Sequence, residues 1–308
     1  MERNNGFLDL NKYFNKFTEK EIAENFLIIP SNWGINHYWM VINGESYYFK
    51  PTNAPYNELI CYEIAKLFNM DAVSCDLASY NDRTGVISKD YRKDNCKYIP
   101  GYKLLEYYYN DQKHIVNEMG LENINWEDNY EGPFYIHMNN LETIWQALEY
   151  LYYKRDKEQI NKCFLKIINQ FMFAILTCQY DKGAQNWELE DDGKNIEIVP
   201  IFDNEGSYSD IDYLSAMSTG FEDVDNTIPK VLERFLKISS SEFIDLFLKY
   251  YNLLTEEKMY EIFKTIETKT GTLIPVEVTN EIISNFNLNR KNIEEVLDKL
   301  KIENSHGR

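Results

Sequence analysis

The pattern of apolar residues changes near residue 100, and this change limits the fold more than any other feature of the chain. Before it, short apolar runs alternate with turn residues, as in His37–Ile42 and Ser46–Lys50, which flank Asn43 and Gly44. Asn-Gly readily supplies the positive φ angles of a tight hairpin turn. A helical stripe covers Asn57–Asn69. Further strands are predicted at Phe26–Pro30, Val73–Tyr80 and Thr84–Tyr91. Residues 1–100 are therefore predicted to form a β-rich lobe with one central helix.

Beyond residue 100 most apolar positions follow the period of a helix. The predicted helices are Gly101–Tyr109, Leu141–Tyr153, Glu158–Thr177, Pro229–Lys237, Ser241–Leu254, Glu256–Lys264, Glu277–Phe286 and Arg290–Lys301. The only later strand signal is a hairpin of Trp187–Leu189 with Asn195–Phe202. The sequence therefore predicts an α+β fold of two lobes, in which residues 101–308 form a mainly helical lobe.

Charge and composition argue against several classes of function. The chain carries a net charge of −18 and has a pI near 4.7, which argues against broad nucleic-acid binding. The longest strongly apolar stretch without charge, Ile167–Tyr180, is too short to span a bilayer. The N-terminus opens no apolar signal region, and the five cysteines form no CxxC pair. We therefore expect a cytoplasmic protein that does not enter a membrane, with a secreted effector left open.

Two short segments contain the residues that indicate a chemical activity. Tyr180–Asn186 closes a long apolar run, and Val199–Gly206 closes a strand-like run. Together they supply Asp181, Asn186 and Asp203. Phosphoryl transfer needs such a set, with one carboxylate to orient the attacking hydroxyl, and an amide and a second carboxylate to hold Mg²⁺ on the phosphates. The alternative is that each residue only forms a turn, which requires the whole ordered set to arise by accident.

A lysine and a glutamate upstream complete the set. Lys50 ends the second strand of the predicted hairpin, where a cation can bind nucleotide phosphates, and Glu58 opens the next helix and can fix Lys50 by an ion pair. The structural alternative is a strand-end lysine with its charge in solvent and a glutamate that favours the helix dipole. Ser31, Asn32 and Gly34 precede the hairpin in a loop that could cover phosphates through backbone amides or simply form a turn.

On these residues the chain resembles the HipA-like family of bacterial serine/threonine kinases, and its length is similar to that of the compact members. The helix Asn57–Phe68 resembles the family's NE…C…LAK.LG helix, and Gly85–Tyr91 resembles the strand that follows it. Phe173–Asn186 resembles the family's catalytic loop, and Pro200–Gly206 resembles its P.YD metal motif. The resemblance implies a bilobed protein-kinase-like fold with a β-rich N-lobe that binds nucleotide.

The resemblance also implies a role for each candidate residue. It makes Asp181 the catalytic residue, Asn186 and Asp203 the Mg²⁺ ligands, and Lys50 the nucleotide-binding lysine. It makes Ser31 a candidate autophosphorylation site, because kinases of this family modify a serine in the equivalent loop. The expected cofactors are therefore ATP and Mg²⁺, and the expected partner is a protein with a serine or threonine acceptor.

The catalytic loop departs from the family pattern at two positions. The family's loop commonly reads D-x-H-x-K-N, whereas Gly183 replaces the histidine and Gln185 replaces the lysine in this chain. The second change removes a charge that would steady the γ-phosphate. Alternatives to a protein kinase are therefore a pseudokinase that binds a nucleotide or a partner, and a kinase of small molecules. The resemblance further suggests a toxin-like role in growth control, with an antitoxin-like regulator as a candidate partner.

Overall fold

The computed structural model describes residues 3–14, 28–30, 37–111, 139–209 and 227–306. The fold is α+β, as predicted, and its contacts divide it into two compact units. The first unit comprises Met1–Arg92, Pro200–Gly206 and Leu253–Ile283, and the second comprises Lys93–Val199, Ser207–Asn252 and Ser284–Arg308. Each unit is thus assembled from separated segments. The division into lobes at residue 100 stays a prediction.

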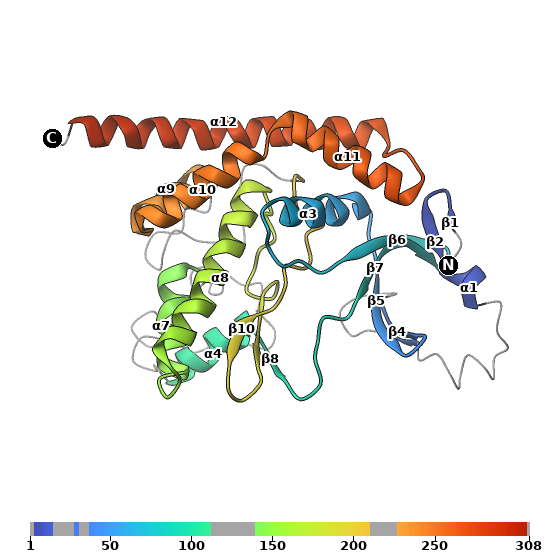
Figure 1. Cartoon of the computed structure of the whole chain (residues 1–308), viewed down its shortest axis with the longest axis horizontal. Coiled ribbons are helices and arrows are strands. Elements are labelled where there is room, and N and C mark those ends of the chain that lie inside the picture. The colour runs from blue at the N-terminus through green and yellow to red at the C-terminus, as the bar shows by residue number, and fades with distance from the viewer. Residues whose placement is uncertain (1–2, 15–27, 31–36, 112–138, 210–226, 307–308) are drawn as a thin grey trace. The chain divides into compact units, whose positions relative to one another are not determined.

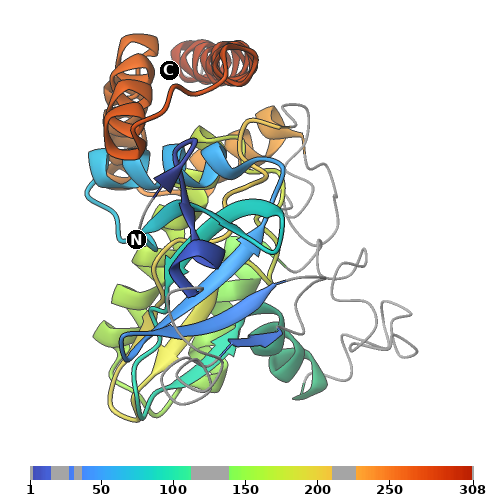
Figure 2. The same cartoon turned by 90° about the vertical axis from the view of Figure 1, so that its right-hand side faces the viewer.

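The first unit is built around a seven-stranded sheet in the order β1-β2-β6-β7-β5-β4-β3. Its strands are β1 (Arg3–Asn4), β2 (Phe7–Asp9), β3 (Ile28–Pro30), β4 (Tyr38–Ile42), β5 (Glu45–Pro51), β6 (Cys75–Tyr80) and β7 (Arg83–Lys89). All neighbours are antiparallel except β2 and β6, which are parallel. The predicted β4–β5 hairpin is confirmed, and its strands run side by side in Figure 2. Asn43 and Gly44 have φ angles of 54° and 79°, as the predicted turn requires.

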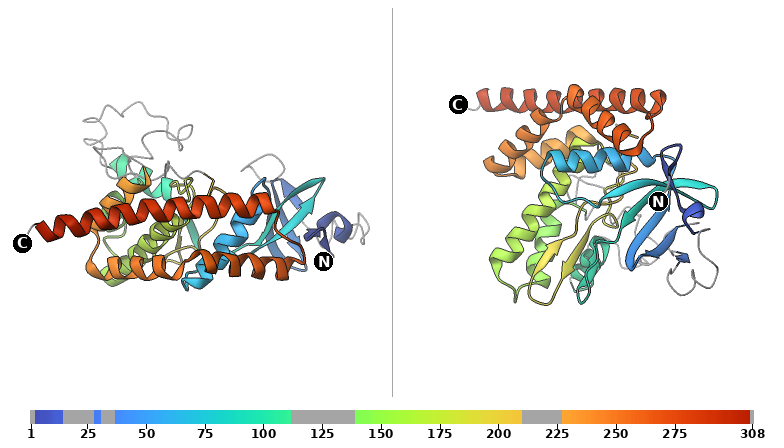
Figure 3. Two further views of the ribbon diagram at one scale, coloured as in Figure 1. Left: turned by 90° about the horizontal axis from the view of Figure 1, so that it is seen from above. Right: turned by 45° about the vertical axis from the view of Figure 1, so that its right-hand side comes forward.

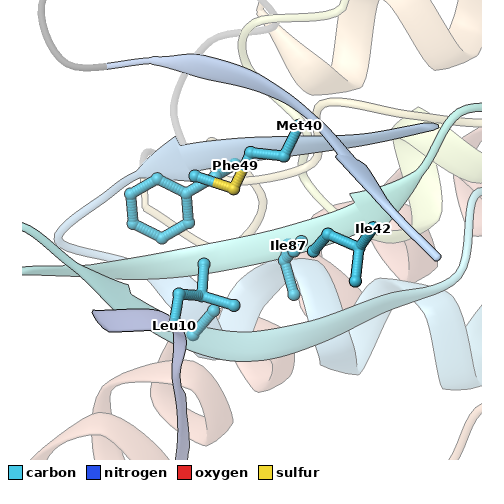
Figure 4. Close-up of a cluster of buried hydrophobic side chains, with 6 residues drawn as sticks. Leu10, Met40, Ile42, Phe49 and Ile87 are labelled. Carbon is cyan, nitrogen blue, oxygen red and sulfur yellow. The ribbon is translucent and has the colours of Figure 1, made fainter. Parts of the chain in front are cut away.

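One face of this sheet carries a buried apolar cluster. Its members are Leu10, Met40, Ile42, Phe49, Ala78 and Ile87, most of which are labelled in Figure 4. Phe49 is fully buried at its centre on β5. Successive side chains of a strand point to opposite faces, so Lys50 lies on the other face of the sheet. The apolar cluster therefore fixes the side to which Lys50 is directed.

Helices α3 (Pro55–Leu67) and α11 (Glu256–Thr270) complete the first unit, together with the short α1 (Leu10–Phe14). Helix α3 contacts β6, β7 and α11 (Figure 1). It begins with Pro55, whose fixed φ angle suits the first turn of a helix. Helix α11 extends past the predicted end at Lys264 and stops at Gly271, which has the left-handed conformation of a helix C-terminus.

The second unit is mainly helical. Its helices include α4 (Gly101–Asp111), α7 (Leu141–Leu151), α8 (Lys157–Leu176), α9 (Ile228–Ile238) and most of α10 (Ser241–Leu253). Helices α7 and α8 pack together, as the green ribbons of Figure 3 show. The predicted hairpin is present as β9 (Glu188–Asp191) and β10 (Ile196–Ile198), but a third strand, β8 (Lys97–Pro100), pairs with β9. Strand β8 has only four residues, too few to give a strand pattern in the sequence.

Helix α12 (Val276–His306) is a single helix of 31 residues, so the prediction of two helices is wrong here. The predicted break falls on asparagines, which are weak helix formers. Asn289 is buried, and its Nδ2 atom donates to the carbonyl oxygens of Ile175 and Leu176 at 3.0 and 3.2 Å. This tertiary contact stabilises the helix by more than the low helix propensity of asparagine destabilises it. In the part of the chain that the structure describes, no helix combines the length and the apolar composition needed to cross a membrane.

Replacing Phe49 by alanine should strongly destabilise the protein, because it empties the centre of the buried cluster. We expect the free energy of unfolding to fall by about 3–5 kcal/mol, as measured by urea denaturation. The control is Leu273→Ala, because Leu273 is 77% exposed in the same unit. This control should change the free energy by less than about 0.5 kcal/mol. Equal effects of the two substitutions would contradict the position of the core.

Candidate active site

Lys50 lies in a cluster of three carboxylates within the first unit. Its Nζ atom is 3.3 Å from Glu58 Oε1 and 3.3 Å from Glu205 Oε2, and it also contacts Asp203 Oδ1. The ion pair with Glu58 that the sequence predicts is therefore present. We call Lys50, Glu58, Asp203 and Glu205 the Lys50 cluster. It joins strand β5, helix α3 and the segment Pro200–Gly206.

Glu58 holds that segment as well as the lysine. Its Oε2 atom accepts hydrogen bonds from the backbone N–H of Asn204 at 2.9 Å and from Asn204 Nδ2 at 3.3 Å. The neighbouring Asn57 donates from Nδ2 to the carbonyl oxygen of Glu205 at 2.9 Å. Both oxygens of the buried Glu58 carboxylate are thus occupied. The first turn of α3 therefore fixes the backbone that carries Asp203.

The segment Pro200–Gly206 is also tied to the rest of the first unit by its apolar residues. The backbone N–H of Ile201 donates to Asp71, and its carbonyl oxygen accepts from Val73, at 2.9 and 2.8 Å. The ring of Phe202 stacks on that of Tyr91, with centroids 5.8 Å apart. The next residue, Asp203, has a φ angle of 58°. This left-handed conformation is costly for a residue with a Cβ atom and is found preferentially where function demands it.

The charges of the Lys50 cluster do not balance. One ammonium group faces the carboxylates of Glu58, Asp203 and Glu205. Burial alone would lower the pKa of Lys50, but these three carboxylates outweigh it and raise that pKa, so Lys50 stays charged. Burial raises the pKa of Glu58, while Lys50 and the Asn204 backbone N–H oppose the shift. With all groups ionised the cluster has an excess of two negative charges, which one divalent cation would neutralise.

The residues present fit a magnesium ion that is shared with phosphates. Within the described residues, no group of three or more His, Cys, Asp and Glu side chains could hold a metal ion alone. Mg²⁺ commonly binds through one or two carboxylates and completes its coordination with water and substrate phosphates. Asp203 and Glu205 are the accessible carboxylates of the cluster, since their side chains are 33% and 41% exposed whereas that of Glu58 is 8% exposed.

The face of the sheet that carries Lys50 also carries aromatic side chains, which the sequence reasoning missed. Tyr48 lies two residues before Lys50 and so on the same face. Trp39 is its cross-strand neighbour on β4, with ring centroids 4.7 Å apart. The Nδ1 atom of His37 is 2.7 Å from the Tyr48 hydroxyl oxygen. Burial lowers the pKa of His37, and the charge of Lys50 lowers it further. A half-buried aromatic surface next to a fixed cation suits a nucleotide base and its phosphates.

Asp181 and Asn186 lie in one loop of the second unit, after α8. Asn186 donates from Nδ2 to the carbonyl oxygen of Asp181 at 2.5 Å and from its backbone to that of Gly183 at 2.9 Å. The Nζ atom of Lys182 donates to the carbonyl oxygen of Asn186 at 2.6 Å. Lys182 is only 1% exposed. These bonds close the loop on itself and commit the amide nitrogen of Asn186, so its Oδ1 atom is the one suited to bind a metal.

Residues far away in the sequence anchor this loop. Asn139 donates from Nδ2 to the carbonyl oxygen of Lys182 at 2.8 Å and accepts from Trp187 Nε1 at 3.0 Å. The backbone N–H of Tyr102 donates to Ala184 at 2.9 Å. Asn139 and Trp187 are buried. Sequence reasoning missed these anchors, because their contacts join segments 40 or more residues apart.

The structure thus brings together the predicted residues in two groups, one in each unit. Lys50, Glu58 and Asp203 share the Lys50 cluster, and Asp181 and Asn186 share the loop after α8. The predicted residues Ser31, Asn32 and Gly34 lie outside the described residues. The roles assigned to all of these residues stay predictions.

Comparison with known proteins supports the fold. The chain is similar to the crystal structure of the Helicobacter pylori proinflammatory kinase CtkA, with a TM-score of 0.61 and 17% identity over 88% of this chain and 95% of that chain. It also matches HipA of Shewanella oneidensis MR-1, solved with HipB and operator DNA, with a TM-score of 0.47 and 12% identity over 89% of this chain and 63% of that chain. No model of a protein family and no curated protein matches the sequence. The likeness to CtkA confirms the kinase-like fold that the motifs predicted.

Replacing Glu58 by glutamine should destabilise the first unit. The substitution removes the charge that faces Lys50 and places an amide where two N–H groups of Asn204 need an acceptor. We expect the free energy of unfolding to fall by about 2–4 kcal/mol, as measured by denaturant titration. The control is Glu45→Gln, which removes the exposed ion pair with Lys89 in the same sheet. It should leave the stability close to that of the wild type, because ion pairs between exposed side chains contribute little. A Glu58→Gln protein as stable as this control would show that Glu58 does not hold the segment.

Proposed function

We propose that this chain is a protein kinase that uses ATP and Mg²⁺ to phosphorylate serine or threonine. The observation that carries the proposal is the Lys50 cluster on a fold similar to that of a kinase. Lys50 Nζ contacts both Glu58 of α3 and Asp203 of the segment Pro200–Gly206. Phosphoryl transfer in protein kinases depends on such a lysine–glutamate pair and on an aspartate that binds magnesium.

Lys50 would bind the phosphates of ATP. Its ammonium group sits on a strand whose other face is buried in the apolar cluster, so it has little freedom to move away. Glu58 would keep it in place, and a preorganised cation stabilises the charge that develops during transfer without further rearrangement. The aromatic pair of Trp39 and Tyr48 would contact the nucleotide base.

Asp181 would orient the acceptor hydroxyl group. It follows α8 in a loop that its own hydrogen bonds make rigid, and a carboxylate held within hydrogen-bond reach of a hydroxyl can direct its oxygen and accept its proton. Asn186 and Asp203 would hold Mg²⁺. When bound, this ion neutralises the charge of the phosphoryl oxygens.

A pseudokinase is the second candidate, because one observation favours it. The loop has Gln185 where HipA-like kinases commonly have lysine, so a cation near the γ-phosphate is missing. Such a protein would bind nucleotide and transfer no phosphate. Regulation by an antitoxin-like partner, and a role in growth control, stay predictions.

Substitution of Asp181 or Asp203 should abolish phosphate transfer. We expect the wild-type protein, with radiolabelled ATP and Mg²⁺, to label itself or a protein in a cell lysate. Asp181→Asn removes the group that orients the hydroxyl and should lower the rate by about 100-fold or more. Asp203→Ala should lower it at least as far. The control is Asp192→Asn, an exposed carboxylate of the second unit, which should leave labelling unchanged.

The outcomes separate the candidate functions. Phosphoserine or phosphothreonine in the hydrolysed product would support the proposal. A wild-type protein that binds ATP but labels nothing would contradict it and favour the pseudokinase. Label that appears only in small molecules would identify a small-molecule kinase instead. Circular dichroism of each variant would show that lost activity does not reflect unfolding.

A further inference from the structure

The side chain of Gln185 folds back over its own loop towards Asp181. Its Nε2 atom donates to Asp181 Oδ1 at 3.4 Å. Both residues are half-buried. Gln185 is one of the two positions at which the loop departs from the pattern of HipA-like kinases. The contact therefore links a feature particular to this chain to the proposed catalytic carboxylate.

Gly183, the other departure, supplies the space for this arrangement. A Cβ atom on Gly183 would lie 2.3 Å from Gln185 Oε1 and 2.6 Å from both Cδ and Nε2. Real Cβ atoms do not approach other heavy atoms so closely. The φ angle of Gly183 is not in the left-handed region that favours glycine, so the need for glycine comes from space. The missing side chain at position 183 thus leaves room for the glutamine side chain at position 185.

The backbone beneath the pair is fixed, so the position of Gln185 follows from the loop itself. The Asn186 N–H donates to the carbonyl oxygen of Gly183 at 2.9 Å, and the buried Lys182 ammonium binds the carbonyl oxygen of Asn186 at 2.6 Å. Gln185 lies between these two anchored residues. Its amide group lies beside Gly183 and donates to the Asp181 carboxylate.

We propose that Gln185 is a positioning residue for Asp181 and that Gly183 is retained to make room for it. A hydrogen bond to Oδ1 restricts rotation of the carboxylate that would orient an acceptor hydroxyl. Rotation about this terminal bond is otherwise soft. Because the amide is neutral, it orients the carboxylate without the charge that a lysine would bring. The catalytic consequence rests on the proposed kinase function, whereas the contact itself does not.

A double-mutant cycle tests the pairing. We expect Gln185→Ala and Gly183→Ala each to lower kcat by about 10-fold or more, the range for loss of a hydrogen bond to a charged group, with the KM for ATP unchanged. If Gly183 acts only through Gln185, the double variant should be no slower than either single variant, because alanine at position 185 leaves nothing to displace. The control is Gln146→Ala, an exposed glutamine on α7, which should keep the wild-type kcat.

An NMR measurement tests the contact without relying on activity. The side-chain amide protons of Gln185 should exchange with solvent more slowly than those of the exposed Gln146, because one of them is hydrogen-bonded to Asp181. This protection should be lost in Asp181→Ala and in Gly183→Ala. Amide protons of Gln185 that exchange as fast as those of Gln146, or strictly additive effects on kcat, would overturn the proposal. If the protection is present but the wild type transfers no phosphate, the kinase function fails together with the catalytic role of Gln185, and the contact alone remains.

Discussion

The contact of one buried ammonium group with three carboxylates organises the first unit. Lys50 binds Glu58 of α3 and also Asp203 and Glu205, which lie about 150 residues further along the chain. Removing such charges from water is expensive, and apolar residues of similar size often stabilise a fold as well or better. A contribution to the stability of the fold therefore does not explain why these charged residues lie together. The partly exposed carboxylates of Asp203 and Glu205 beside a charged lysine make the cluster a candidate functional site.

Local signals made much of the fold predictable. Asn43 and Gly44 predicted the hairpin because their backbone preference alone selects the turn. The continuity of α12 was not predictable, since the Nδ2 atom of the buried Asn289 donates to carbonyl groups more than 100 residues away. No pattern within the helix reveals that partner.

The candidate site, too, could be predicted from the sequence only where its residues lie close together along the chain. The spacing of Asp181 and Asn186 could be recognised in the sequence because both lie in one short loop, which a hydrogen bond from the Asn186 side chain to the carbonyl oxygen of Asp181 closes. Asn139 carries no signal of its own, because its importance comes from bonds to Lys182 and Trp187 across the fold. Sequence reasoning interpreted only the departure at position 185, as the loss of a charge. Only side-chain geometry shows that the residues at positions 183 and 185 fit each other.

The unbalanced charge beside Lys50 has a thermodynamic consequence for any anionic ligand. The carboxylates of Asp203 and Glu205 repel a free phosphate group, and a divalent cation bound beside them would weaken that repulsion. Under the proposed function, cation and nucleotide are therefore linked ligands, and each raises the affinity of the other by the same factor. The dissociation constant measured for such a nucleotide would therefore depend on the concentration of free magnesium, and it would have to be stated together with that concentration.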